Sequence, residues 1–268
     1  MKASATDPVE LPAGTVFIGD LHLDVDDLHA VARFELTLAA LRPAPRIVFV
    51  GDVFEYWIGP AQGAGEGGQR VLAALAAAAR DAAVDVVPGN RDFLLEARFE
   101  RASGAAVRHG GFVGRLPGGE RMLVIHGDEL CTLDRNYLRL RAVLRSPLLR
   151  WAAPRLPESV ARAIARKLRR ASTRALAAKP KGQAEQQPDA VRDFARSASA
   201  GVLLCGHAHR YRDERLPDGP RWIVLDAWGE RRDLIRVLPG GALAAGSTAS
   251  AGGSALGTDP GAGSLLGG

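Results

Sequence analysis

Five short apolar segments recur along the chain, and each is followed closely by a side chain that can bind a metal ion. Their length and their content of valine and isoleucine are typical of buried β-strands. The segments are 16–18, 47–50, 84–87, 122–125 and 202–205. The residues that follow them are Asp20 and His22, Asp52, Asn90, His126, and His207 with His209. This repetition restricts the chain to folds in which strands end around one site.

The segments between these strands favour helices. Residues 28–41 are amphipathic and residues 69–83 are rich in alanine, a strong helix former. Strands that alternate with helices predict an α/β domain. Residues 222–225 and 234–238 predict two more strands, which we expect to be antiparallel, so the chain forms either a mixed sheet or a pair of sheets.

Composition suggests the limits of this domain. Residues 1–14 are expected to be an N-terminal tail and residues 15–239 the folded domain. From residue 240 to residue 268 almost every residue is Gly, Ala, Ser, Thr or Leu, which predicts a disordered tail. Prolines divide residues 135–181 into short helical segments, so we expect a helical insert or cap there. The glycine-rich residues 60–68 predict a mobile loop.

The overall composition excludes several classes of protein. With 268 residues, of which 47% are hydrophobic and 24% charged, the chain can bury one large core. It contains no apolar run of the roughly 18–20 residues that a membrane span needs, and its start does not resemble a signal peptide. These features predict a cytoplasmic protein, in which Cys131 and Cys205 remain thiols.

Polar residues at the carboxyl ends of strands in an α/β sheet share one crevice. We therefore expect the seven side chains to form one site, although any one of these fragments alone would be an ordinary turn. Seven oxygen and nitrogen ligands suit two metal ions, and imidazole with carboxylate favours manganese, iron or zinc. Asp52 could bridge ions roughly 3.5–4 Å apart, an arrangement that hydrolyses phosphate esters or anhydrides.

The strings GDLHLD, GDVFEYW, GNRD, HGDE and GHAH, in this order, resemble the five motifs of the calcineurin-like metallophosphoesterases. The resemblance covers residues 15 to about 238 and implies a four-layer β-sandwich flanked by helices, of class α/β. It also implies two divalent ions. One would be held by Asp20, His22, Asp52 and His209, and the other by Asp52, Asn90, His126 and His207.

Arg91 departs from that pattern, because most of the superfamily has histidine at this place in the third motif. Arginine cannot act as an acid at neutral pH, but its planar fork matches the oxygens of a phosphate. This favours a substrate with a second phosphoryl group, as in a pyrophosphate. The alternative is a salt bridge between Arg91 and Asp92 or another carboxylate.

Positive charge is concentrated in the segment 135–181, which has 14 Lys and Arg and a single acid, Glu158. Its net charge is therefore +13, and the rest of the chain carries −8 of the total of +5. Apolar residues such as Leu148 and Trp151 lie among the cations, which suits an anionic membrane or an acylated anionic substrate. Nucleic acid also binds basic segments, but this one has little aromatic surface for base stacking, so no nucleic acid is expected. A solvated basic helix face is the remaining alternative.

A closer resemblance rests on GDVFEYWIG, GNRDFLLEARF, HGDELCTLDRNY, RRAST, GHAHR and VLDAW. These strings resemble the UDP-2,3-diacylglucosamine diphosphatases of lipid A synthesis, which are peripheral enzymes at the cytoplasmic face of the inner membrane. The resemblance implies manganese-dependent hydrolysis of a lipid nucleotide to UMP and 2,3-diacylglucosamine 1-phosphate. It implies catalytic roles for Asp52, Asn90, Arg91 and His126. It implies substrate contacts by Asn90, Arg91, Asp134, Ser172, Lys179 and His207.

Two departures from that family lie around the cap. Leu176 replaces the usual asparagine, and Gln186-Gln187-Pro188-Asp189 replaces an Asp-Val-Asn signature. They affect the expected contacts with sugar and acyl chains and leave the metal chemistry unchanged. Another two-metal phosphoesterase, acting on a soluble nucleotide pyrophosphate or nucleic acid, remains the alternative function. A binding scaffold without activity would be expected to have lost ligands, and all seven are present. The sequence leaves the oligomeric state open.

Overall fold

Two six-stranded sheets form the centre of the fold in the computed structural model, which describes residues 7–57, 59–157, 159–160, 163–164, 167 and 182–249. The first sheet consists of β2 (Val16–Ile18), β3 (Arg46–Val50), β4 (Ala83–Val87), β5 (Ala106–Val107), β11 (Leu234–Val237) and β12 (Leu243–Gly246). Its order is β12-β11-β2-β3-β4-β5. The strands β2, β3 and β4 are parallel, so their carboxyl ends lie at one edge.

The second sheet consists of β1 (Val9–Glu10), β6 (Phe112–Arg115), β7 (Arg121–Val124), β8 (Val202–Cys205), β9 (Arg212–Arg215) and β10 (Arg221–Val224). Its order is β1-β6-β7-β8-β10-β9. The strands β7, β8 and β10 are parallel, β6 is antiparallel to β7 but parallel to β1, and β9 is antiparallel to β10.

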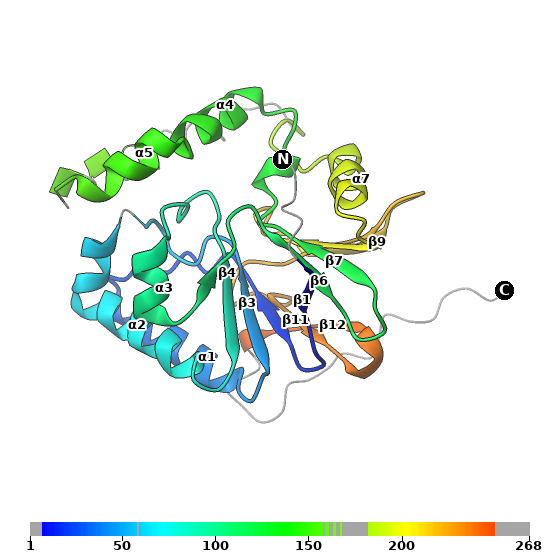
Figure 1. Ribbon diagram of the computed structural model, residues 1–268, viewed down its shortest axis with the longest axis horizontal. Coiled ribbons are helices and arrows are strands. Elements are labelled where there is room, and N and C mark those ends of the chain that lie inside the picture. The colour runs from blue at the N-terminus through cyan, green and yellow to red at the C-terminus, as the bar shows by residue number, and fades with distance from the viewer. Residues whose placement is uncertain are drawn as a thin grey trace.

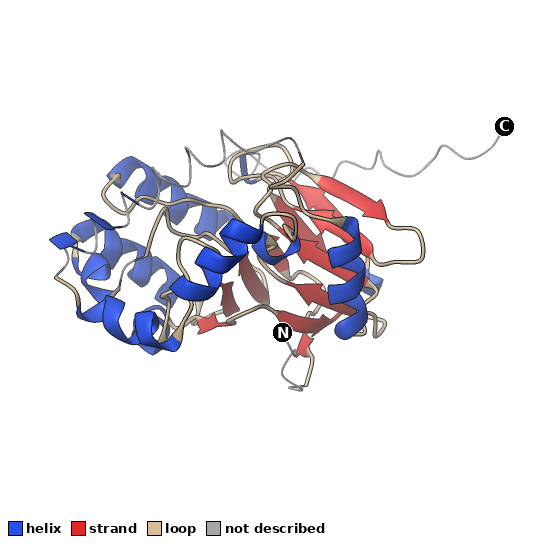
Figure 2. Ribbon diagram, turned by 90° about the horizontal axis from the view of Figure 1, so that it is seen from above, coloured by secondary structure: helices blue, strands red, loops and turns tan. Residues whose placement is uncertain are grey.

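Helices cover the outer face of each sheet (Figures 1 and 2). The helices α1 (Leu28–Ala40), α2 (Glu66–Ala78) and α3 (Ala97–Ser103) lie beside the first sheet, and α7 (Pro188–Ser197) lies against the second. The first of these begins at Asp27, whose side chain accepts hydrogen bonds from two backbone amides of the first turn. The expected four-layer α/β sandwich is confirmed.

The two sheets bury a common apolar layer between them. Alternate side chains of each strand point into this layer, as the period of two in a β-strand requires. Its members include Phe17, Val48, Val50 and Val87 from the first sheet and Met122, Val124, Leu204 and Ile223 from the second. This layer fixes the carboxyl ends of β2, β3 and β4 opposite those of β7 and β8.

Above this edge lie α4 (Arg135–Leu144) and α5 (Pro147–Ala152), followed by a 3-10 turn at Ala153–Arg155 (Figure 1). They are the described part of the expected cap. No helix in the described parts of the chain is long and apolar enough to cross a bilayer.

Several expected boundaries are wrong. The expected N-terminal tail contains β1 and the fully buried Leu11, because pairing with β6 brings this segment onto the second sheet. The expected C-terminal tail begins too early, since β12 pairs with β11 and Thr248 donates its backbone N–H to the buried Asp233 at 2.8 Å. Residues 250–268 lie outside the described residues.

The glycine-rich segment 60–68 also differs from expectation, because it forms a 3-10 helix, Pro60–Ala64, and the first turn of α2. The two late strands, β10 and β11, belong to different sheets. The strand β11 is antiparallel to β2, as expected, but β10 is parallel to β8 and antiparallel only to β9.

Candidate metal centre

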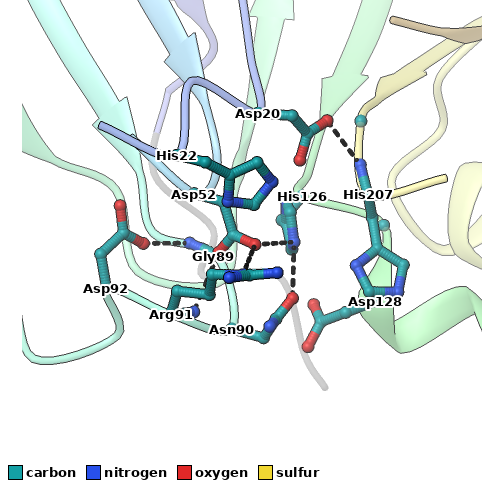
Figure 3. A network of polar contacts seen from close by, with 12 residues as sticks. Asp20, His22, Asp52, Gly89, Asn90, Arg91, Asp92, His126, Asp128 and His207 are labelled. Atoms are coloured by element: carbon teal, nitrogen blue, oxygen red, sulfur yellow. Dashed lines mark hydrogen bonds and ion pairs between the residues drawn. The ribbon is translucent and has the colours of Figure 1, made fainter. Parts of the chain in front are cut away.

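The seven predicted ligands lie on the five loops that follow β2, β3, β4, β7 and β8. Figure 3 labels six of them, all except His209. Two groups of side chains bring their ligand atoms within 4.8 Å of one another. The first group is Asp20, His22 and His209, and the second is Asp20, Asp52 and His126. Asn90 adjoins the second group, since its Oδ1 lies 3.1 Å from Nε2 of His126. Strands from both sheets therefore contribute to one cluster.

Asp20 lies where the two groups meet. Its Oδ2 accepts a hydrogen bond of 2.8 Å from the backbone N–H of His207, and its Oδ1 lies 3.4 Å from Nε2 of His209. The same Nε2 lies 2.9 Å from Nε2 of His22. Three donor atoms from two distant loops thus point toward one position.

Asp52 and His126 form the other side of the cluster. Oδ2 of Asp52 lies 3.7 Å from Nε2 of His126, and Oδ1 accepts a hydrogen bond of 2.9 Å from the backbone N–H of Arg91. His207 lies beside them, although it belongs to neither close group. Its ring is edge-on to that of His126, with centroids 5.0 Å apart, and it stacks on Tyr137 at 6.4 Å.

The charged groups of the cluster shift one another's pKa values. Burial raises the pKa of Asp52 to about 7, with His126 opposing the shift. Burial by itself would lower the pKa of His126, but the carboxylates of Asp52 and Asp20 outweigh it and raise that pKa to about 9. Burial and cationic neighbours lower the pKa of His22 to about 3 and that of His207 to about 4. These last two imidazoles are neutral at pH 7, the form that binds metal.

Backbone strain is concentrated at the same residues. Seven non-glycine residues of the described chain have positive φ, and five of them are predicted ligands: Asp20, His22, Asp52, His207 and His209. Such conformations cost free energy and persist at sites where function requires them. Gly51 permits a close approach as well, because a Cβ there would lie 1.9 Å from Nδ1 of His126.

The chemistry of the donors fits divalent metal ions. Two buried atoms, Oδ1 of Asp20 and Nδ1 of His22, form no hydrogen bond with any of the described residues. A buried polar atom without a partner is costly unless a ligand satisfies it. Carboxylate and imidazole donors without a thiolate suit hard and borderline cations. The site therefore supports divalent ions, as the sequence predicts.

Arg91 pairs with carboxylates at the rim of the site. Its Nη1 donates to Oε1 of Glu55 at 2.6 Å, and its Nε lies 3.5 Å from Oδ2 of Asp52. Asp92, the partner considered from the sequence, instead accepts the backbone N–H groups of Gly89 and Val53 at 2.7 and 2.8 Å. Asp92 thus joins the loops that follow β3 and β4.

The cap is attached to the site by a buried carboxylate that the sequence analysis did not single out. Oδ2 of Asp128 accepts hydrogen bonds from the hydroxyl of Tyr137 at 2.7 Å and from Nε of Arg141 at 2.6 Å. Arg145 donates to the carbonyl of Gly89 at 2.9 Å. Two arginines of the basic segment therefore point inward and hold α4 against the ligand loops.

The predicted substrate contacts are only partly described. Asp134 is buried and caps α4, where it accepts the backbone N–H of Tyr137 at 3.2 Å. Ser172, Lys179 and Leu176 lie outside the described residues. Glu55 and Tyr137 are not among the predicted site residues, although both lie within strings that carry the closer resemblance. A polar residue next to a ligand motif was the available signal for each.

Several curated proteins similar to this chain are named UDP-2,3-diacylglucosamine hydrolase. A UDP-2,3-diacylglucosamine hydrolase of Aeromonas salmonicida is 36% identical over 232 residues, covering 84% of this chain and 90% of the relative. That of Aeromonas hydrophila is 34% identical over 230 residues, covering 84% and 95%, and that of Shewanella pealeana is 32% identical over 224 residues, covering 83% and 93%. No family model matches the chain.

Solved structures with a similar arrangement are more distant. Vacuolar Protein Sorting 29 from Cryptosporidium parvum is 13% identical with a TM-score of 0.44, covering 87% of this chain and 90% of its own. The phosphoesterase Yfce of E. coli is 17% identical with a TM-score of 0.42, covering 87% and 92%.

Proposed function

The chain belongs to the UDP-2,3-diacylglucosamine hydrolase family, and on this premise we propose that it hydrolyses the pyrophosphate bond of UDP-2,3-diacylglucosamine. The products are UMP and 2,3-diacylglucosamine 1-phosphate, a step of lipid A biosynthesis. The observation that carries the proposal is the convergence of carboxylate, imidazole and amide donors from five strand ends on one strained, buried cluster.

Two divalent ions, proposed to be manganese, would be held in this cluster. Asp20, His22, Asp52 and His209 would hold one ion, and Asp52, Asn90, His126 and His207 the other. Such ions supply hydroxide near neutral pH and neutralise charge on a phosphoryl group. Asp52 suits the bridging position, because it is nearly inaccessible to water and its ligand atom lies within 4.8 Å of that of Asp20, which belongs to both groups.

Arg91 is proposed to bind the pyrophosphate. Glu55 holds one arm of its guanidinium, and this pairing orients the remaining N–H groups at the rim of the cluster. About a third of the side chain stays exposed. Glu55 also lies 3.8 Å from Nδ1 of His22, so one carboxylate positions both a metal ligand and a phosphate-binding arginine.

A cavity of about 620 Å³ beside the site would take the acyl chains. It lies between α3, α5 and the loop after β3, and Trp57, Leu94, Phe99 and Trp151 contribute apolar surface. Arg98, Arg150 and Arg155 add positive charge to its lining. The backbone N–H of Trp57 donates to the carbonyl of Arg91 at 3.0 Å, which connects the cavity directly to the phosphate-binding residue.

The outer face of the cap would contact the cytoplasmic face of the inner membrane. Val143 and Leu148, which are not part of the cavity lining, are 58% and 72% exposed, and the cation Arg139 is exposed near them. Apolar side chains that insert among lipids, next to cations that attract anionic headgroups, are typical of interfacial helices.

The proposal is tested by incubating the purified full-length chain and Mn²⁺ with UDP-2,3-diacylglucosamine. A panel of soluble substrates, namely UDP-N-acetylglucosamine, p-nitrophenyl phosphate esters and DNA, is assayed in parallel, and Asp52→Ala serves as the inactive control. We expect UMP and the lipid 1-phosphate, with preference for the lipid nucleotide. A preference for any soluble phosphoester would contradict the proposal.

A further inference from the structure

Gln186 is buried between the loops that follow β7 and β8, and its side-chain amide joins them. Nε2 donates to the carbonyl oxygens of Gly127 at 3.2 Å and Gly206 at 3.0 Å. Oε1 accepts the thiol of Cys205 at a sulfur–oxygen distance of 3.8 Å. Gln186 as a whole residue is 8% exposed, so water does not compete for these contacts.

The backbone around the amide is shaped to receive it. Gly127 has φ of +109°, and a Cβ at this position would lie 2.5 Å from Nε2 of Gln186. Any other residue there would therefore displace the amide. On the other side, the backbone N–H of Gln187 donates to the carbonyl of Leu130 at 2.9 Å, which holds the segment before α7 against the loop after β7.

Each of the two joined carbonyls neighbours a predicted ligand. Gly127 follows His126 and Gly206 precedes His207. The backbone hydrogen bonds that join β7 to β8 end close to these carbonyls. The N–H of Ile125 donates to the carbonyl of Leu204 at 3.2 Å, and the N–H of Gly206 donates to the carbonyl of His126 at 2.9 Å. Beyond these bonds, the amide of Gln186 joins the two loops by hydrogen bonds to both of them.

We propose that Gln186 is a positioning residue that fixes the spacing of His126 and His207, and with it the affinity of the ion they share. This role rests on the proposed function, because it concerns the metal site proposed there. A contact behind the ligands typically changes metal affinity by 10–100-fold. Asp20 and His22 lie on the loop after β2, outside the two loops that the amide joins, so we expect a smaller effect on the other ion.

The test titrates Mn²⁺ into chelator-treated protein by calorimetry. Gln186→Met keeps the volume and removes both donor bonds, and Gln186→Glu keeps the shape but presents an anion to two carbonyls. Gln187→Ala is the matched control, since the side-chain amide of Gln187, among the described residues, donates to the carbonyls of Gly182 and Glu185 nearby in the chain and to neither ligand loop.

We expect two binding steps in the wild type, with one step weakened at least about tenfold by either Gln186 variant and unchanged in the control. At saturating Mn²⁺, kcat should fall with KM for the lipid nucleotide unchanged. Two unaltered binding steps in a folded variant would overturn the proposal. Failure of both variants to fold would also overturn it, because Gln186 would then act in folding alone.

The outcomes separate this inference from the proposed function. A wild-type chain that binds two ions but does not cleave the lipid nucleotide refutes the function and leaves the result on Gln186 valid. A wild-type chain that cleaves the lipid nucleotide, with Gln186 variants that bind Mn²⁺ normally, refutes only the inference.

Discussion

The Nε2 atoms of His22 and His209 lie 2.9 Å apart, although 187 positions separate the two residues in the chain. His22 is held neutral, with its pKa lowered to about 3, so its Nε2 can present a lone pair. Two imidazoles and the carboxylate of Asp20 thus face one point. The loops after β2 and β8 converge there because the apolar layer between the sheets holds the two strands together.

Removing one of these imidazoles should abolish metal-dependent activity without unfolding the protein. His209→Ala is expected to lower kcat by at least about 100-fold and to weaken one Mn²⁺ binding step, because the ion loses a ligand. His29→Ala, at an exposed position on α1, is the control and should behave like the wild type. Full activity of His209→Ala, or of a chelated wild-type sample, would refute the assignment.

The planar guanidinium of Arg91 should bind the phosphate oxygens of the pyrophosphate. Arg91→Ala is expected to cost at least about 2 kcal/mol in transition-state stabilisation, a roughly 30-fold fall in kcat/KM, and Arg91→Lys should restore only part of it. Glu55→Gln should lower kcat/KM as well, because the guanidinium loses its 2.6 Å partner. Steady-state kinetics on the lipid nucleotide measure each variant. An alanine variant with normal kinetics would leave Arg91 a purely structural ion pair.

Membrane contact should depend on the outer face of the cap. The double variant Val143→Asp and Leu148→Asp replaces two exposed apolar side chains outside the cavity lining, so its binding to anionic vesicles should weaken and its apparent KM for lipid substrate should rise. Leu36→Asp is the control, because Leu36 is also 72% exposed but belongs to α1, which lies at the opposite end of the view from α4 and α5 (Figure 1). Equal vesicle sedimentation of the two variants at low salt would show that the cap face is only solvated.

The cavity between α3 and α5 should set the acyl-chain length. Ala97→Trp places an indole in the cavity that Ala97 lines, so substrates with long acyl chains should show a higher KM while short-chain analogues are still cleaved. Ala102→Trp, at an exposed position on the same helix, controls for the effect of a bulky residue on α3. Identical chain-length profiles for both variants would exclude the cavity as the acyl site.

The Cys205 thiol should be inert in the native protein. Burial raises its pKa to about 12, so at pH 8 the reactive thiolate is nearly absent. Because the folded state holds this proton more tightly than the unfolded chain does, its contribution to stability is present below about pH 9 and is lost as the pH rises toward 12. Labelling with a thiol reagent at pH 8, followed by peptide mapping, should modify Cys205 only after denaturation. Rapid labelling of the native protein would contradict its burial.

The sequence by itself determined the parts of this protein that depend on neighbouring residues. The buried strands β2, β3, β7 and β8 each contain an uninterrupted apolar run, and in β4 only Asp85 interrupts it, so their positions could be predicted to within a residue or two. The turn that follows each strand carries its ligand, and the chemistry of those side chains could be read from their types. The local sequence therefore predicted both the strands and the donors.

Only the tertiary structure decided how these strands are shared between two sheets and what supports the ligands. The two-residue strand β1 and the Gly- and Ala-rich β12 have almost no apolar signal of their own, and they form because a neighbouring strand offers hydrogen bonds. Gln186 lies 59 positions after Gly127 and 20 before Gly206, so nothing local marks its role. Contacts between distant segments depend on how apolar layers pack, and packing is a property of the whole chain.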